Sequence, residues 1–385
     1  MRFLLLNQCF YPDVVSTAQH LTDLATELSS QGHSVTVVTS DRGYDDPARR
    51  FPRRERWKEI TIIRIPSLAL GKNSKWRRGL SFASFLMVCS AHLLTLKRFD
   101  VVVALTSPPL ISFLATLFVK LKGGRFCFWV MDLNPDEAIA AGWLDEDSRM
   151  ARLLDRMLRW SLEHADRTVV LDRFMKERVL AKGVDPDRVA VVPPWSHDDA
   201  VRYSAGGREA FRARHGLSEK FVVMYSGNHS PCHPLDTLLA AALEFKDHEE
   251  IAFCFVGGGS EQTKVREFAA RHQLGNVTCL PYQPLSELSG SLSAGDLHVV
   301  VMGDPFVGIV HPCKIYNILS IGAPVLYIGP EPSHITDLNL FSVRHGDVAA
   351  VTACIRETRI ETPTLTNLFS KHTLLPQMME EVTLS

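Results

Sequence analysis

Along the first half of the chain, short apolar runs alternate with longer segments that have helical spacing. Runs rich in Val, Ile and Leu predict strands at 2–7, 34–39, 60–65, 100–105, 125–131 and 168–171. Between the first two, Leu21, Leu24, Ala25 and Leu28 recur at helical intervals, which predicts a helix over 17–31 that Gly32 closes. Continuous apolar strands joined by helices are typical of a parallel, doubly wound sheet.

The same alternation starts again after a Pro-rich segment near 190–200. It predicts strands at 221–226, 251–257, 277–280, 297–302 and 324–329, and helices at 234–245, 260–272 and 312–321. A chain of 385 residues is also too long for one ordinary core. We therefore expect an α/β protein of two Rossmann-like domains facing each other across a cleft, over 1–195 and 196–365, with a helix in 366–385 that packs back toward the first domain.

The common phosphate-binding loops are missing from these predicted domains. The first strand runs into Asn7–Asp13 without a GxGxxG pattern, and in the run that begins at Gly257 the third glycine position is Gln262. No GxxxxGK[ST] segment occurs. These differences argue against a dinucleotide-binding or P-loop enzyme.

Glycines instead follow three predicted strands of the second domain, at Gly227, at Gly257–Gly259 and at Gly308. Ligands of open α/β sheets bind beyond the carboxyl ends of strands, where glycine lets a ligand approach the backbone. Each glycine alone is typical of an ordinary turn, but the three together favour a ligand site.

The segment from Gly308 to Asn317 is the most informative part of the sequence. Pro312 suits the first position of a helix, whose N-terminal end attracts anions. Lys314 in the first turn opposes the helix dipole at a cost of a few tenths to about 1 kcal/mol, which a bound phosphate would offset. A solvated surface lysine is the alternative.

Several motifs resemble, in order, those of the family-4 glycosyltransferases of GT-B fold, over about residues 1–375. They are Phe10-Tyr11-Pro12, Gly32-His33-x-Val35-x-Val37, Tyr225-Ser226-Gly227-Asn228, Phe255–Ser260, and Pro312-x-Lys314 followed by Gly322-x-Pro324-Val325. The chain is most similar to the group that builds bacterial surface polysaccharides. The resemblance implies retaining sugar transfer from a UDP- or GDP-linked donor in the second domain to a lipid-linked or oligosaccharide acceptor in the first. It implies no required metal and no cofactor besides the donor substrate.

The chain also departs from the family pattern. Val15 and Ser16 stand where many members have a Gly-Gly pair, and Ile309 and Asn317 stand at the glutamates of the E-x7-E pattern. The Pro-x-Lys variant partly compensates by placing Lys314 near the donor phosphates.

From these motifs we expect Lys314 and Asp132 as catalytic residues. Lys314 would stabilise the charge that develops on the leaving diphosphate, and Asp132 would orient or deprotonate the acceptor hydroxyl, although a capping role for Asp132 is equally open. The expected donor-binding residues are Gly227, Asn228, His229, Gly257, Gly258, Tyr282, Gln283, Gly308, His311, Pro312, Cys313 and Asn317. Tyr282 and Gln283 would line the base pocket.

Charge is balanced overall but not locally. The chain has a net charge of −1, whereas residues 49–78 hold 11 Lys and Arg against 2 acidic residues, with Trp57 and Trp76 among them. This stretch runs into Leu80, Phe82, Phe85, Leu86 and Val88, which spread wider than one buried helix face requires. We expect residues 49–88 to bind an anionic membrane surface rather than nucleic acid, with a solvated loop as the alternative.

The remaining features favour a cytoplasmic protein on the inner face of the membrane. Eight scattered cysteines indicate reduced thiols, the N-terminus is not typical of a secretory signal, and no run of 18 apolar residues occurs. His229-x-x-Cys232-His233 has too few ligands for a zinc site, so no metal is expected. Two other functions stay open, a nucleotide-sugar epimerase and a non-catalytic nucleotide-binding or scaffold protein, the latter favoured by the missing glutamates.

Overall fold

The computed structural model describes residues 1–44, 46, 48–68, 75–358 and 368–384. Its contacts divide the chain into two compact units. The first unit contains residues 1–193, 308–311 and 374–385, and the second contains residues 194–307 and 312–373. The sequence places the domain boundary at 195/196 and assigns 308–311 to the second domain.

The first unit is built on a sheet of eight strands in its described residues, in the order β3-β4-β2-β1-β5-β6-β7-β8. All neighbours are parallel except β3 and β4. The strands are β1 (Arg2–Leu6), β2 (Ser34–Ser40), β3 (Arg54–Trp57), β4 (Ile60–Ile65), β5 (Val101–Ala104), β6 (Arg125–Trp129), β7 (Arg167–Val170) and β8 (Val189–Val191). The central strands are buried along their length, as a sheet covered on both faces requires.

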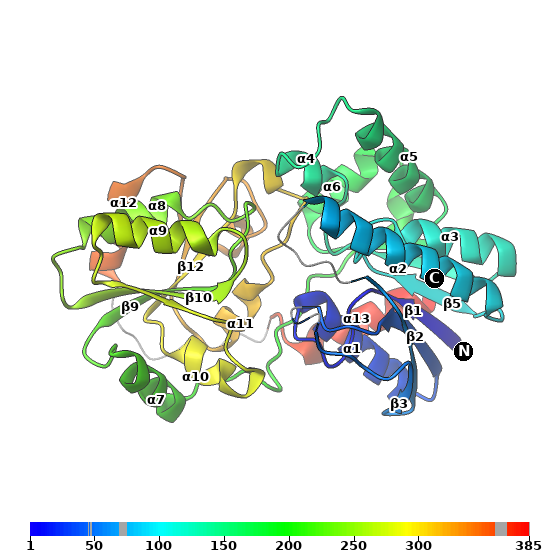
Figure 1. Cartoon of the computed structure of the whole chain (residues 1–385), viewed down its shortest axis with the longest axis horizontal. Coiled ribbons are helices and arrows are strands. Elements are labelled where there is room, and N and C mark those ends of the chain that lie inside the picture. The colour runs from blue at the N-terminus through cyan, green and yellow to red at the C-terminus, as the bar shows by residue number, and fades with distance from the viewer. Residues whose placement is uncertain (45, 47, 69–74, 359–367, 385) are drawn as a thin grey trace. The chain divides into compact units, whose positions relative to one another are not determined.

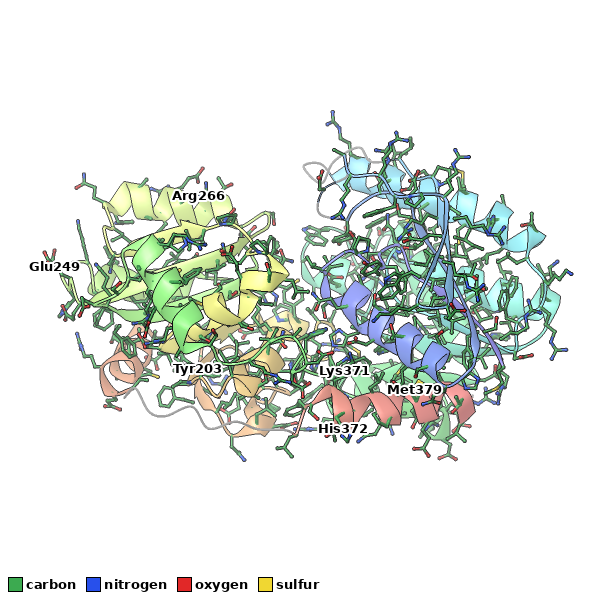
Figure 2. The ribbon with its side chains drawn as sticks, turned by 90° about the horizontal axis from the view of Figure 1, so that it is seen from below. Tyr203, Glu249, Arg266, Lys371, His372 and Met379 are labelled. Atoms are coloured by element: carbon green, nitrogen blue, oxygen red, sulfur yellow. The ribbon has the colours of Figure 1, made fainter. Side chains whose placement is uncertain are left out.

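Helices cover both faces of this sheet. They are α1 (Ser16–Ser30), α2 (Lys75–Thr95), α3 (Ile111–Lys122), α4 (Asp136–Ala140), α5 (Arg149–Glu163), α6 (Arg173–Ala181) and most of α13 (Lys371–Leu384). Figure 1 shows α2, α3 and α5 on one side of the sheet and α1 and α13 on the other. Helix α13 is held within the first unit by an ion pair between Glu381 and Arg167 and by the buried side chain of Met379, which Figure 2 labels.

The second unit contains a six-stranded, fully parallel sheet in its described residues, in the order β11-β10-β9-β12-β13-β14. The strands are β9 (Phe221–Asn228), β10 (Ile251–Gly258), β11 (Val277–Leu280), β12 (Leu297–Val301), β13 (Val325–Ile328) and β14 (Phe341–Val343). The helices are α7 (Ala205–His215), α8 (Asp236–Glu244), α9 (Gln262–His272), α10 (Leu288–Ser293), α11 (Lys314–Ser320) and α12 (Val348–Glu357).

Alternate residues of β9 pack on opposite helix layers. Val223 and Tyr225 belong to the core formed with α8 and α12, whereas Val222 and Met224 pack with Phe211 of α7. The chain order reverses direction between β9 and β12, so the ends of these strands form the point at which ligands bind in open α/β sheets. The two doubly wound, mainly parallel sheets confirm the fold class expected from the sequence.

The sequence also led to expectations about membrane-spanning helices and about disulfides. None of the helices in the described residues has both the length and the apolar composition needed to cross a bilayer. The eight cysteines form no disulfide, and six of them are buried.

Candidate functional site: a lysine at the strand ends of the second unit

Glycines at the carboxyl ends of β9 and β10 bring the backbones of these strands close together. Gly227, Gly257 and Gly259 all have positive φ, at 140°, 135° and 137°. A Cβ built on Gly257 would lie 2.0 Å from the Gly227 carbonyl oxygen, and one on Gly259 would lie 2.2 Å from the His229 carbonyl oxygen. Only glycine fits these two positions without moving the neighbouring strand.

The space that Gly227 leaves open is occupied by the side chain of Lys314, the first residue of α11. A Cβ on Gly227 would lie 2.9 Å from Lys314 Nζ, and this nitrogen sits 3.9 Å from the centroid of the Tyr225 ring. The Lys314 residue as a whole is half-buried, but its Nζ is buried and has no hydrogen-bond partner in the described residues. Burial lowers the pKa of Lys314 to about 7.

Two buried histidines accompany this lysine. Burial, followed by the charge of Lys314, lowers the pKa of His229 to about 4 and that of His233 to about 3. The Nδ1 atom of His233 is 2.7 Å from the Val301 carbonyl oxygen, to which it donates as N–H, whereas neither ring nitrogen of His229 makes a hydrogen bond in the described residues. At neutral pH both rings are therefore neutral.

Lys314, His229, His233 and Tyr225 together form what we call the Lys314 cluster. An unpaired ammonium in a buried site is unfavourable, and an anion that entered would restore the interactions that burial has removed. The cluster lies at the carboxyl ends of β9 and β12, so its chemistry fits the binding of a phosphate or diphosphate.

The structure brings seven of the expected site residues to this region. Gly227 and Asn228 end β9 and His229 follows it, Gly257 and Gly258 end β10, and Lys314 starts α11. Tyr282, half of whose surface is exposed, donates its hydroxyl to the Gly258 carbonyl oxygen at 3.1 Å. Gln283 is half-buried, and its side-chain amide donates to the Pro281 carbonyl oxygen of its own loop.

The helix after Pro312 differs from the expectation. It begins at Lys314, with Cys313 as N-cap and Pro312 before it, and has 7 residues rather than the expected 312–321. Asn317 accepts a hydrogen bond from the His197 backbone N–H at 2.9 Å, which gives its side-chain oxygen a structural contact. The cation of Lys314, rather than the start of the helix, is the feature that fits an anion.

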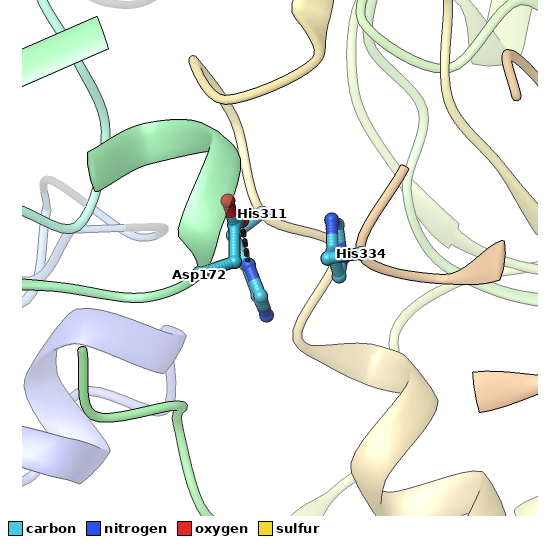
Figure 3. Close-up of side chains that lie close together, drawn as sticks. All are labelled: Asp172, His311 and His334. Carbon is cyan, nitrogen blue, oxygen red and sulfur yellow. Dashed lines mark hydrogen bonds and ion pairs between the residues drawn. The ribbon is translucent and has the colours of Figure 1, made fainter. Parts of the chain in front are cut away.

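Gly308 and His311 belong to the first unit. A Cβ on Gly308 would lie 2.6 Å from the Phe174 carbonyl oxygen, and the Leu133 backbone N–H donates to the Ile309 carbonyl oxygen. His311 Nδ1 is 2.7 Å from Asp172 Oδ2, the hydrogen bond drawn in Figure 3. Both side chains are buried, and Asp172 also caps α6 through the Met175 N–H. Sequence reasoning missed this pair because 139 residues separate its members.

Asp132 lies in the first unit, in the loop after β6. It is half-buried, and its backbone N–H is 3.3 Å from the Thr106 hydroxyl. The residue therefore follows a carboxyl strand end, as the sequence indicates.

In the basic stretch at 49–78, Arg64 is buried, whereas the other described Lys and Arg residues are exposed. Arg64 pairs with Glu55 and donates to the Tyr11 carbonyl oxygen at 2.8 Å, while Trp57 stacks on the Tyr11 ring at 4.1 Å. Lys72 and the side chains of Lys75, Trp76 and Arg78 lie outside the described residues. Of the five apolar residues that follow, Leu80 is exposed, Phe82, Leu86 and Val88 are half-buried, and Phe85 is buried. Phe85 therefore lies on the buried face of α2, and Leu80 lies on its exposed side.

His229, Cys232 and His233 follow β9 in the second unit. Among the described residues, His229, Cys232 and His233 do not bring three ligand atoms together. His233 already uses Nδ1 on the Val301 carbonyl oxygen.

Comparisons with known proteins place this geometry in context. Residues 17–195 match the family described as "Glycosyl transferase 4-like domain". The chain is 25% identical over 335 residues to the Escherichia coli K12 protein named "Putative colanic acid biosynthesis glycosyl transferase WcaI", which covers 84% of this chain and 82% of that protein. It is 28% identical over 272 residues to the "Probable glycosyltransferase WbjE" of Pseudomonas aeruginosa, over 69% of this chain and 67% of that one. Its fold is similar to that of Anabaena Alr3699/HepE, solved in complex with UDP-glucose, with a TM-score of 0.74, 15% identity and complete coverage of both chains.

Proposed function

We propose that this chain is a family-4 glycosyltransferase of GT-B fold, which transfers a sugar from a nucleotide-sugar donor to a glycan acceptor in surface-polysaccharide synthesis. The names of the two bacterial relatives support the biosynthetic role. The complex of a structural neighbour with UDP-glucose supports a UDP-linked donor, and a GDP-linked donor is the other candidate.

The observation that carries this proposal is the buried, unpaired Nζ of Lys314 over Tyr225. When the bond between the sugar C1 and the diphosphate breaks, negative charge develops on the leaving group while the acceptor oxygen bonds to C1. A cation held in a buried site stabilises such charge strongly. Gly227 and Gly257–Gly259 let the diphosphate approach the strand ends.

Replacing Lys314 with methionine tests this assignment. Loss of a charge-assisted contact should weaken binding of UDP, or of GDP, by about 10- to 100-fold, equivalent to about 1.5–3 kcal/mol. Isothermal calorimetry measures the affinity, and Lys246→Met, at an exposed lysine of the same unit, is the matched control. Unchanged affinity in a folded Lys314→Met protein would remove Lys314 from the donor site.

On the acceptor side we propose that Asp132 orients or deprotonates the acceptor hydroxyl. Asp132→Asn should lower the rate of transfer by about 10²–10⁴-fold and leave nucleotide affinity unchanged, since general-base assistance has that magnitude. Glu146→Gln, at an exposed carboxylate of the same unit, is the control. Transfer at the normal rate by Asp132→Asn would give Asp132 a structural role.

We further propose that transfer retains the anomeric configuration and requires no metal ion. The family resemblance supports retention, and the charge that Lys314 can supply supports metal independence. Proton NMR of the first-formed product reads the anomer, and transfer in the presence of excess EDTA reads the metal requirement.

Two rival functions are separated by one experiment. A panel of nucleotide sugars is incubated with the purified protein and a lipid-linked or oligosaccharide acceptor. A transferase releases nucleoside diphosphate in an acceptor-dependent manner, an epimerase changes the sugar without acceptor, and a scaffold protein does neither. We expect the first result, with the protein at the cytoplasmic face of the membrane, where lipid-linked acceptors are available.

A further inference from the structure

Four residues of the second half of the sequence, Gly308–His311, belong to the first unit. The residues on either side of them, Val307 and Pro312, belong to the second unit, so the chain leaves that unit for this segment and then returns to it. Three of the four residues are buried. We call residues 308–311 the strap. Lys314, at the centre of the Lys314 cluster, follows the strap after two residues.

Three contacts hold the strap within the first unit, and two of them involve its backbone. The backbone N–H of Leu133, in the loop after β6, donates to the Ile309 carbonyl oxygen at 2.9 Å. Gly308 lies against the first turn of α6, where a Cβ would come 2.6 Å from the Phe174 carbonyl oxygen at a φ of 70°. Both contacts bring the backbone of the strap directly against other backbone of the first unit.

The third contact uses more of Asp172 than a helix cap requires. Asp172 is the N-cap of α6, where Oδ1 accepts the Met175 N–H at 2.8 Å. Its other oxygen, Oδ2, accepts from Nδ1 of His311 at 2.7 Å within a buried pair (Figure 3). Asn or Ser would cap the helix equally well with one oxygen. The second oxygen therefore serves the strap, and the buried carboxylate gains a second partner for its charge.

The link between the strap and Lys314 is short and stiff. Only Pro312 and Cys313 separate His311 from Lys314, so the Cα atoms of His311 and Lys314 lie within about 11 Å of each other in any conformation of the chain. Pro312 has a fixed φ and also restricts the residue before it. At the start of α11, Cys313 makes no side-chain capping hydrogen bond, so the short helix does little to fix its own first residue. The position of Lys314 therefore depends on where the strap is held.

We propose that Asp172 is a positioning residue for the donor site: it holds His311, and through the strap it keeps Lys314 where the diphosphate binds. This role rests on the donor site proposed above and extends it, because a residue of the first unit then controls an affinity that is set in the second. Linkage makes the effect reciprocal, so a ligand on Lys314 also stabilises the contacts of the strap.

Asp172→Asn tests this role with UDP as the probe. The asparagine keeps an oxygen for the Met175 N–H but turns an amide donor toward His311. With the charge-assisted bond lost, the strap should be docked in only about a tenth of the molecules, and the apparent affinity for UDP should fall about tenfold with that fraction. If Asp172 only capped α6, the first unit would lose stability and the affinity for UDP, measured by calorimetry, would not change.

Hydrogen exchange of the Leu133 amide reports the strap directly, because this N–H donates to Ile309. In Asp172→Asn the amide should exchange at least about tenfold faster than in the unmodified protein, and saturating UDP should slow the exchange again. UDP should also slow the exchange of this amide in the unmodified protein. This second measurement tests the proposal even if Asp172→Asn does not fold.

Asp185→Asn is the matched control. Asp185 is an exposed residue of the same unit, and its side chain accepts the Asp187 N–H at the start of a short 3₁₀ helix. The control should bind UDP, and exchange its Leu133 amide, as the unmodified protein does. In a Lys314→Met background, Asp172→Asn should weaken UDP binding by less than about twofold, because the contact that the strap positions is already lost.

Three results would overturn the role of Asp172 alone. They are equal UDP affinities of Asp172→Asn and Asp185→Asn, a full tenfold loss from Asp172→Asn in the Lys314→Met background, and a Leu133 amide that does not respond to UDP in a protein that binds UDP. If the unmodified protein bound neither UDP nor GDP, the donor site itself would be overturned, and this role of Asp172 with it.

Discussion

Lys314 illustrates how a single residue can trade stability for binding. In the empty protein its ammonium is buried over the Tyr225 ring with no hydrogen bond in the described residues, which disfavours the charged form. An anionic ligand reverses this effect, because the same burial strengthens the attraction between opposite charges. The residue is therefore suited to a site that is alternately empty and filled.

This behaviour makes donor binding dependent on pH. With a pKa of about 7 in the empty protein, Lys314 is protonated below pH 7 and progressively neutral above it. Bound diphosphate raises the pKa, so binding takes up a proton, and the affinity for UDP-glucose should be constant below about pH 7 and fall by up to about tenfold per pH unit above it. Calorimetry at pH 8, in two buffers that differ in ionisation enthalpy, measures the proton uptake.

Two observations isolate Lys314 as the titrating group. The pKa values of His229 and His233, about 4 and about 3, keep both rings neutral over this range. A Lys314→Arg variant should bind with little pH dependence, since a guanidinium stays protonated.

The stability of the empty protein should rise with pH, whereas the affinity for UDP-glucose falls. The unfolded chain binds more protons between the folded pKa of about 7 and the ordinary 10.5, so this group makes stability rise with pH across that window. If the affinity of the unmodified protein for UDP-glucose did not change between pH 7 and pH 9, Lys314 would not be the titrating group.

At the scale of elements, the strand ends of β9 and β10 depend on glycine for their geometry. Gly257→Ala would place a Cβ 2.0 Å from the Gly227 carbonyl oxygen at a φ of 135°. We expect this change to lower the free energy of unfolding by about 3 kcal/mol or more, because backbone strain and a backbone clash act together.

Urea unfolding of the second unit's transition measures this loss. Gly275→Ala is the matched control, since a Cβ there meets no atom within 4 Å, and it should change stability by less than about 1 kcal/mol. Equal stability of the two variants would show that the strand ends can move apart.

The elements show what the sequence could and could not predict. The apolar central strands of both sheets were predictable, since burial on both faces requires continuous apolar runs. Strand β3, with the sequence RERW, was missed because it is an edge strand whose polar residues carry no such run, and β8 and β14 have three residues each. The sequence position of Lys314 led us to expect it at the donor phosphates. Its contact with the Tyr225 ring and the placement of its Nζ beside Gly227 could not be predicted, because they depend on how segments far apart in the sequence pack together. The sequence could not show that Met87 and Leu94 are exposed. Apolar residues occur on several sides of α2, and their spacing does not tell which side faces the sheet.

At the scale of the whole molecule, the chain returns to its first unit after completing the second. Residues 374–385 group with the first unit, although the same helix, α13, begins at Lys371 in the second. Within the first unit, Arg125 donates to the carbonyl oxygens of Thr383 and Leu384, and Arg167 pairs with Glu381. The buried apolar residues of this part are Leu374, Leu375, Met378, Met379 and Val382.

Truncation after Thr373 should therefore damage the first unit and spare the second. Full burial of one such side chain is worth about 1.5–3 kcal/mol, so five of them rival the whole stability of a domain. In calorimetric scans the truncated protein should lose the first unit's transition, or show it at a much lower temperature. The remaining transition should still shift upward with UDP, because the Lys314 cluster lies entirely in residues 194–307 and 312–373. Glu381→Gln, which removes the ion pair with Arg167 and keeps the helix, should give a loss of only about 1 kcal/mol. Loss of the UDP-dependent shift on truncation would mean that the donor site needs the C-terminal helix, and would place part of that site outside the second unit.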